Sequence, residues 1–238
     1  MNARLDSLRP LRLLLSTEHG CSYLPGRSAR HLVADPLLVD NQVYSHLATL
    51  GFRRSGDHIY RPHCSGCKAC LSLRVRAQAF RLDRSQRRTW KRNQDLQVYR
   101  LRPVFEFEHY HLFSRYLQAR HPGGGMEDSS PESYLSFITA GWSDTVLYEF
   151  RRDAELLAVA IVDRLDAGLS AVYTFFDPAE AARSPGTYAI LWQLAEARRL
   201  GLEWVYLGYW VQECPKMAYK VKFRPHQLFV GGNWIEVG

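Results

Sequence analysis

The stretch from residue 145 to residue 209 constrains the fold most strongly, because its hydrophobic pattern changes from a strand period to a helix period and back. Three runs rich in β-branched and aromatic residues predict an antiparallel meander, namely Thr145 to Arg151, Leu156 to Asp163 and Leu169 to Phe176. A helix from Thr187 to Leu200 and a strand from Trp204 to Tyr209 should follow. A right-handed crossover would make the last two strands parallel, and we expect them to splay apart and leave a cleft where the helix begins.

Further helices are predicted before the meander. Helical spacing of apolar residues indicates helices over residues 36–50, 105–120 and 130–140, the last of them capped by Ser130. A glycine-rich stretch separates the second helix from the third, and we expect Gly123 to Ser130 to form a mobile loop. Helices, meander, helix and strand together predict the α+β class.

This layout is the architecture of acetyltransferase-like (GNAT) proteins. The chain has 238 residues and 46% hydrophobic residues, enough for one large domain or two small ones. We expect an N-terminal cysteine-bearing and substrate-recognition domain, residues 1–103, and a GNAT-like acyltransferase domain, residues 104–238. The apolar run Leu13 to Leu15 is too short for a signal peptide or a membrane span, so we expect a cytoplasmic protein with no membrane partner.

Three cysteines with two-residue gaps, Cys64, Cys67 and Cys70, form the clearest chemical motif. Thiolates at this spacing can bind zinc or an iron–sulfur cluster, with Cys21 or His63 as the fourth ligand. A zinc ribbon would need a second C-x2-C pair, which the sequence lacks, so free thiols are the alternative. Five cysteines without an export signal argue against a disulfide framework.

The segment that follows the cysteines is strongly basic. Residues 71–102 contain ten Arg or Lys and two Asp, in a chain whose net charge is +7. A helix capped by Ser85, or starting just before it, would gather five cations on one face, namely Arg84, Arg87, Arg88, Lys91 and Arg92. Few acids are interleaved to pair with them, so we expect the stripe to bind the phosphates of a nucleic acid; a solvated surface, an anionic membrane or an acidic protein are the alternatives.

Aromatic and cationic residues alternate near the C-terminus. Five of them lie at the mouth of the predicted cleft, namely Tyr209, Trp210, Lys216, Tyr219 and Lys220. Such interleaving suits stacking on a nucleotide base and pairing with a phosphate or carboxylate. The helix after the meander is preceded by one glycine, Gly186, whereas coenzyme A enzymes use a richer loop to hold the pyrophosphate. The free backbone N–H groups at the start of this helix can bind an anion, but they are a weak indication of coenzyme A binding.

Several motifs together resemble a known family. They are Cys21 to Pro25, Gly51 to Gly56, Tyr60 to Pro62, Cys64 to Cys70, Leu73 to Val75 and the run from Tyr206 to Pro225. Over nearly the whole chain they resemble bacterial leucyl-tRNA:protein transferases that act on N-terminal aspartate and glutamate. The chain is similar more distantly to eukaryotic arginyl-tRNA:protein transferases, but Leu24 stands where that family has the second cysteine of an early pair.

The resemblance implies transfer of leucine from leucyl-tRNA to proteins that begin with Asp or Glu, which creates a degradation signal. An aminoacyl ester is already activated, so we expect no required cofactor; the enzyme has to place a neutral amine against the ester carbonyl and stabilise the oxyanion. We expect Arg54 or Arg74 to bind the acidic side chain. The basic helix from Arg84 to Arg92 would hold the tRNA phosphates. Tyr209 and Trp210 would wall the bound substrate, and catalytic roles would fall to Lys216, Tyr219 and Lys220.

Two other functions fit parts of the sequence. A coenzyme A-dependent N-acetyltransferase would account for the C-terminal fold, although the phosphate loop is poor. A non-catalytic cysteine-ribbon RNA-binding protein would account for the thiols and the charge, but it would leave the cleft unused.

Overall fold

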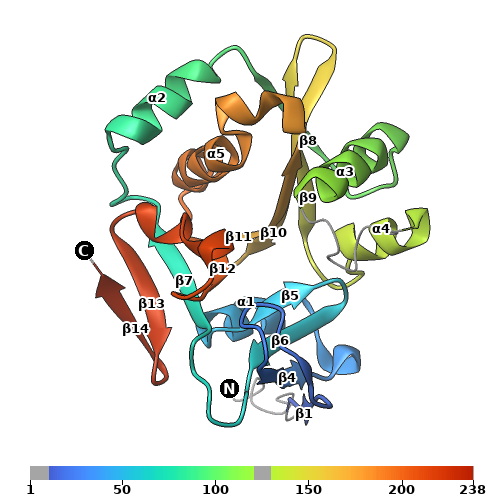
Figure 1. Ribbon diagram of the computed structural model, residues 1–238, viewed down its shortest axis with the longest axis vertical. Helices are drawn as coiled ribbons and strands as arrows, with labels where there is room; N and C mark the ends of the chain where they lie inside the picture. Colours follow the sequence, from blue (N-terminus) through green and yellow to red (C-terminus); the bar gives the residue numbers. More distant parts are fainter. Residues whose placement is uncertain (1–10, 121–129, 238) are drawn as a thin grey trace, which may run out of the picture.

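The computed structural model describes residues 11–120 and 130–237 (Figure 1). At its centre lies a mixed sheet with the strand order β14-β13-β7-β12-β11-β10-β9-β8. Its strands are β7 (Leu71–Arg76), β8 (Gln97–Leu101), β9 (Thr145–Arg152), β10 (Glu155–Leu165), β11 (Gly168–Phe176), β12 (Trp204–Trp210), β13 (His226–Val230) and β14 (Asn233–Val237). The described chain is a mixed structure of helices and strands, as the predicted α+β class requires.

The predicted meander and crossover are both present. β9, β10 and β11 pair antiparallel, and β12 runs parallel to β11. These two strands pair only between Gly168–Ser170 and Trp204–Tyr206. Beyond these residues the two strands no longer pair with each other. We call this region, residues 171–176 of β11 and 207–210 of β12, the strand fork.

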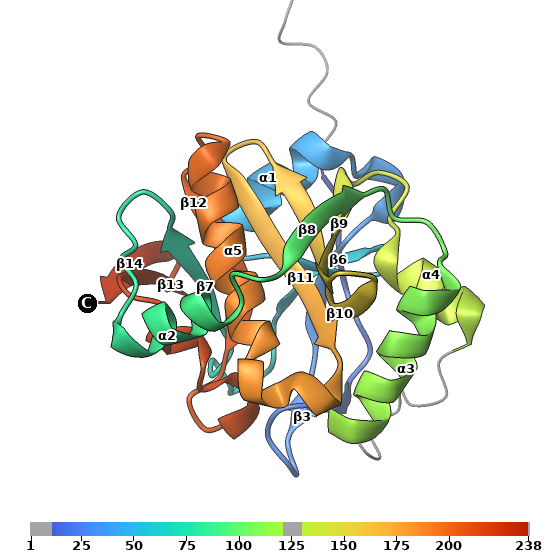
Figure 2. The same ribbon diagram turned by 90° about the horizontal axis from the view of Figure 1, so that it is seen from above.

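Helices cover one face of the large sheet (Figure 2). α5 (Pro185–Arg199) packs against β10, β11 and β12, and α3 (Phe107–Arg120) packs against β10 and β11. α5 begins earlier than predicted because proline suits the first helical position, where no backbone N–H is needed. Trp192 of α5 packs against Tyr148 of β9 with the two rings tilted, and their centroids lie 4.6 Å apart. In the described ranges, no helix is both long and apolar enough to cross a membrane.

The two helices predicted on either side of residue 125 are also present. α3 ends at Arg120, and of the predicted loop from Gly123 to Ser130 all but the last residue lies outside the described residues. α4 (Pro131–Ile138) begins at Ser130, whose Oγ accepts a hydrogen bond from Ser133 N at 3.2 Å. The predicted cap is therefore confirmed.

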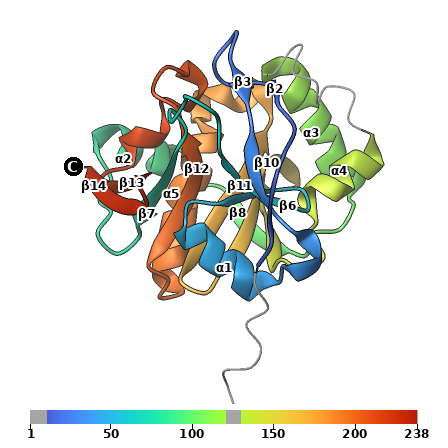
Figure 3. The same ribbon diagram turned by 90° about the horizontal axis from the view of Figure 1, so that it is seen from below.

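A smaller sheet covers the opposite face (Figure 3). Its strands, in spatial order, are β1 (Leu13–Leu15), β4 (His31–Ala34), β6 (His58–Pro62) and β5 (Arg53–Ser55), and a separate ribbon contains β2 (His19–Gly20) and β3 (Ser28–Ala29). The single helix predicted over residues 36–50 is wrong. Asp35 and Asp40 each cap a separate element, and the chain forms the 3-10 turn η1 (Pro36–Leu38) followed by α1 (Asn41–Thr49).

Two strands from before residue 103 belong to the large sheet. β7 pairs with β12 and β13, and β8 pairs with β9. An apolar cluster also joins α1 and the small sheet to the large sheet, and beside it the hydroxyls of Tyr44 and Ser170 lie 3.0 Å apart. The division of the chain at residue 103 stays a prediction, with strands from both sides of that residue in one sheet.

Candidate active site

The strand fork contains an arginine from the small sheet. Arg53 of β5 extends to β11, where its Nη2 donates a hydrogen bond to the backbone oxygen of Val172 at 3.2 Å. Its guanidinium also lies against Gly208 of β12, where an added Cβ would be 2.6 Å from Nη1. Gly208 has a φ of +72° and lies at a bulge in the pairing of β12 with β7. A side chain here would collide with Arg53 and strain the backbone.

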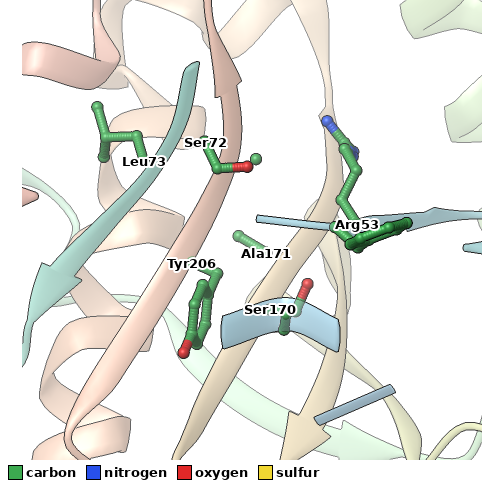
Figure 4. A pocket seen from close by; sticks show the side chains of 9 residues that line it. Arg53, Ser72, Leu73, Ser170, Ala171 and Tyr206 are labelled. Carbon is green, nitrogen blue, oxygen red and sulfur yellow. The ribbon is translucent and has the colours of Figure 1, made fainter. Parts of the chain in front are cut away.

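Arg53 lines a narrow pocket at the strand fork, whose interior has room for about one water molecule. Figure 4 shows it with Ser72, Ser170, Ala171 and Tyr206 around this pocket. The walls therefore come from β5, β7, β11 and β12. No Asp or Glu among the described residues forms an ion pair with Arg53, so the fold leaves this charge uncompensated.

The neighbouring arginine is bound within the fold. Successive strand residues point to opposite faces, and Arg54 is only 1% exposed. Its Nε and Nη2 donate to the two carboxylate oxygens of Asp163 at 2.7 and 2.9 Å. Its remaining N–H groups reach Thr145 Oγ1 and two backbone oxygens. All of its donors are used, so the prediction that Arg54 binds the substrate does not fit this geometry.

Three tyrosines surround the guanidinium of Arg53. The ring centroid of Tyr209 lies 5.9 Å from Arg53 Cζ and 5.8 Å from the ring centroid of Tyr60. The Tyr209 hydroxyl donates to the backbone oxygens of Tyr60 and Gly51, at 2.8 and 3.1 Å. Tyr23 is hydrogen-bonded to Tyr60. Burial raises the pKa of Tyr209 and of Tyr23, so both hydroxyls are neutral and Tyr209 supports the wall from inside the fold.

Lys220 is buried beside the strand fork, in the 3-10 turn η4 (Lys220–Lys222). Its Nζ donates to the backbone oxygen of Tyr209 at 2.5 Å. Burial, and then the nearby charge of Arg53, lower the pKa of Lys220 to about 7. An ordinary lysine has a pKa near ~10, so this amine is unusual in being partly neutral at neutral pH. A neutral amine can accept a proton from a substrate.

The two other predicted catalytic residues lie in different surroundings. Tyr219 is 42% exposed, and burial of its hydroxyl, together with the nearby Tyr116, raises its pKa while Arg53 lowers it. Lys216 lies in the 3-10 turn η3 (Pro215–Met217) and is exposed. The structure therefore brings Tyr219 and Lys220 close to Arg53 and leaves Lys216 on the surface.

The predicted substrate residues Arg74 and Trp210 are partly buried. Arg74 Cζ lies 3.7 Å from the ring centroid of Trp204 and 4.1 Å from that of Trp234, and Nε donates to Gln227 Oε1 at 2.9 Å. Burial lowers the pKa of Arg74. Its cation is therefore already stacked on two indole rings. Trp210 packs against the large core and the apolar cluster around the cysteines.

The four predicted metal ligands share one pocket. Cys21, Cys64, Cys67 and Cys70 line about 580 Å³ of empty space together with Tyr23 and Tyr60, whereas His63 does not line it. Burial, and then the neighbouring thiols, raise the pKa of Cys70 to about 12. Across residues 11–120 and 130–237, no group of three or more His, Cys, Asp or Glu side chains is arranged to hold a metal ion.

The basic helix forms as predicted and is hydrogen-bonded to η4, the turn that contains Lys220. α2 (Arg84–Arg92) exposes all five predicted cations, Arg84, Arg87, Arg88, Lys91 and Arg92, and none forms an ion pair with a described carboxylate. Of the two predicted starts, the one just before Ser85 is confirmed: Asp83 caps the helix, in a capping box with Gln86. Gln86 Nε2 donates to the backbone oxygen of Lys222 at 3.0 Å, which fastens α2 to η4.

Sequence reasoning missed Arg53, although it lies in the motif Gly51 to Gly56. Adjacent arginines in a strand necessarily point to opposite faces, so one of Arg53 and Arg54 had to enter the interior. The partner of Arg54, Asp163, is more than a hundred residues away in β10, and nothing local indicates which arginine it binds.

Known proteins show similarity over nearly all of the chain. Two family models match: arginine-tRNA-protein transferase, N terminus, at residues 19–88, and arginine-tRNA-protein transferase, C terminus, at residues 108–230. Together they define the class, proteins related to arginine-tRNA-protein transferases.

Two curated relatives narrow this class. The chain is 50% identical to an aspartate/glutamate leucyltransferase from Stutzerimonas stutzeri, over 97% of this chain and 99% of the relative. It is 54% identical to one from Nitrosococcus oceani, over 92% and 93%. The chain therefore belongs to the aspartate/glutamate leucyltransferase family. Among solved structures, L-PGS from Bacillus licheniformis aligns with a TM-score of 0.47 and 13% identity, over 60% of this chain and 47% of that one.

Proposed function

We propose that this protein is an enzyme that transfers leucine from leucyl-tRNA to the N-terminal Asp or Glu of proteins and thereby marks them for degradation. The observation that carries the proposal is the near-full-length relationship to aspartate/glutamate leucyltransferases. The site is consistent with this chemistry, because an uncompensated cation, Arg53, and a lysine of lowered pKa, Lys220, lie together at the strand fork.

The exposed stripe on α2 would bind the tRNA phosphates. Its cations have no described carboxylate partners, so counterion release on binding a phosphate backbone favours the complex. The hydrogen bond from Gln86 to Lys222 connects the stripe to η4. A tRNA held on α2 could therefore present its aminoacyl end to Tyr219 and Lys220. Trp210 would contribute to the wall near the cysteines.

Lys220 is our candidate for the general base. The attacking α-amine must lose a proton, and free α-amines have a pKa near ~8. A lysine whose pKa is about 7 is close to the optimum for taking this proton at neutral pH. Lys216 is exposed, so we assign it at most an electrostatic role toward the tRNA. Tyr219 could donate a hydrogen bond to the oxyanion, since its raised pKa keeps it protonated.

The finer description of the fold is also a proposal. The short parallel pairing of β11 and β12, followed by the strand fork, supports a GNAT-like acyltransferase domain that contains residues 104–238. β7 and β8 would complete its sheet, although both precede residue 103. We place the reaction in the cytoplasm because charged tRNA is made and used there.

The four cysteines form a candidate site for zinc or an iron–sulfur cluster. All four line one pocket, and sulfur donors suit both groups. The described side chains do not converge on one point, so Cys21, Cys64, Cys67 and Cys70 would have to rotate inward to bind either group. Either group, if bound there, would crosslink the N-terminal segment and so have a structural role. The transfer reaction itself would need no cofactor, because the aminoacyl ester is already activated. To test this proposal, the metal content of the wild-type protein and of Cys67→Ser would be measured and compared. Visible absorbance would distinguish an iron–sulfur cluster from zinc.

The test of the function uses single-turnover transfer to a peptide that begins with Asp. We expect label from leucyl-tRNA on the peptide and none from labelled acetyl-CoA. Lys220→Met should slow the transfer step at saturating leucyl-tRNA, whereas Lys216→Ala should keep a near-normal rate. Acetyl transfer would contradict the proposal, and a normal rate for Lys220→Met would remove Lys220 as the base.

A further inference from the structure

The guanidinium of Arg53 is held without an acidic partner. The fold gives it one hydrogen bond to a described residue, from Nη2 to Val172 O, and places Tyr23, Tyr60 and Tyr209 around it. Its Nε and Nη1 have no hydrogen-bond partner among the described residues. Both atoms nevertheless keep some contact with solvent. These two donors are therefore accessible to a ligand. A charge inside a fold without a paired anion is costly, which points to a ligand that supplies one.

The other arginines next to the pocket are already engaged. Arg54 uses all its donors within the fold, and Arg74 is stacked on Trp204 and Trp234. The backbone at Gly208 is shaped so that the guanidinium of Arg53 can lie against it. Arg53 therefore keeps two donor groups, Nε and Nη1, available for a ligand.

We propose that Arg53 binds the side-chain carboxylate of the N-terminal Asp or Glu and so determines the acidic specificity of the enzyme; this inference rests on the proposed leucyl transfer. A guanidinium binds a carboxylate through two parallel N–H···O bonds, and a neutral amide cannot replace that interaction.

The position of Lys220 supports this role. Its amine is close enough to Arg53 for the arginine charge to affect it, and both groups adjoin Tyr209. The carboxylate and the α-amine of an N-terminal Asp belong to one residue and are a few bonds apart. Anchoring the carboxylate on Arg53 would therefore present the amine to Lys220.

A phosphate near the 3′ end of the tRNA is the competing ligand. The geometry favours a carboxylate, because Arg53 lies between two strands and against a backbone glycine, where a single side chain can reach it. The exposed cations suited to a phosphate backbone are on α2.

The test compares peptides that begin with Asp or with the isosteric, neutral Asn. For wild type, Arg53→Lys and Arg53→Gln, we would measure kcat/KM for each peptide and KM for leucyl-tRNA. We expect the Asp:Asn ratio to fall at least ~10-fold in Arg53→Gln, the loss of about one charge-assisted hydrogen bond, and to be partly retained in Arg53→Lys. Arg164→Gln, which removes an exposed ion pair with Asp144, is the matched control and should keep the wild-type ratio.

An unchanged Asp:Asn ratio in Arg53→Gln would overturn the inference, and a raised KM for leucyl-tRNA alone would indicate the phosphate ligand. If the variants are inactive or misfolded, wild type decides: the Asp peptide should protect Arg53 from phenylglyoxal, mapped by mass spectrometry, and the Asn peptide should not. Equal protection would refute the proposal. Absence of leucyl transfer by wild type would instead refute the proposed function, whatever the protection experiment shows.

Discussion

Replacing Lys220 with methionine should change how stability depends on pH. The pKa of Lys220 falls from 10.5 in an unperturbed lysine to about 7 in the fold. Each pH unit of this difference corresponds to about 1.4 kcal/mol, so the fold opposes the charged amine by about 5 kcal/mol. Methionine has a similar length and no charge, so Lys220→Met removes this cost. It also removes the hydrogen bond to Tyr209 O, but that loss does not depend on pH.

The sign of the effect follows from proton binding. Below pH 7 the lysine is protonated in both the folded and the unfolded chain, and the whole cost is present. Between pH 7 and 10.5 the unfolded chain binds one more proton than the folded chain, so wild-type stability rises with pH relative to the variant. From pH 6 to pH 9, wild type should therefore gain about 3 kcal/mol over Lys220→Met.

Urea unfolding of both proteins at the two pH values measures this difference. Other titrating groups are shared by both proteins and cancel. A variant-to-wild-type difference that stays constant with pH would refute the reasoning, because it would mean that Lys220 keeps an ordinary pKa in the fold. A difference that changes in the opposite direction would mean that the fold stabilises the charged amine.

Three other predictions follow from particular contacts. Arg88→Ala should weaken leucyl-tRNA binding and reduce the slope of log affinity against log salt by about 1, measured by fluorescence anisotropy; an unchanged slope would exclude a phosphate contact. Gly208→Ala should lose about 1–3 kcal/mol of unfolding free energy, because its Cβ meets Arg53 and its φ is positive; wild-type stability would contradict this. Asp163→Asn should cost about 3–5 kcal/mol, because Arg54 is left buried without its counterion, and a small change in urea midpoint would contradict that reading.

The elements best predicted from the sequence are those set by local periodicity. The meander, α5 and β12 repeat their hydrophobic pattern over enough residues to be recognised. The cap of α4 is also local, because Ser130 accepts a hydrogen bond from Ser133 N, only three residues further along the chain. The helix predicted over residues 36–50 fails because Asp40 offers a second cap within the apolar pattern. The place of β7 between β12 and β13 depends on distant pairings, which the pattern of Leu71–Arg76 cannot indicate.

The same limit applies to the site. The interleaved residues near the C-terminus predicted part of the candidate site, but burial alone separates Lys220 from Lys216, and burial is a property of the packed chain. Arg53 differs from Arg54 by the face of one strand. The role that we propose for Arg53 depends on a glycine in β12 and on the absence of a described acidic partner, and neither feature is local to residue 53.

The central claim is transfer of leucine to acidic N-termini, and one experiment tests it directly. Purified protein would be mixed with tRNA charged with radiolabelled leucine and with peptides that differ only in a first residue of Asp, Glu, Asn, Ala, Lys or Arg. We predict label on the Asp and Glu peptides alone. Label on the Lys or Arg peptides, or on none of the peptides, would contradict the account.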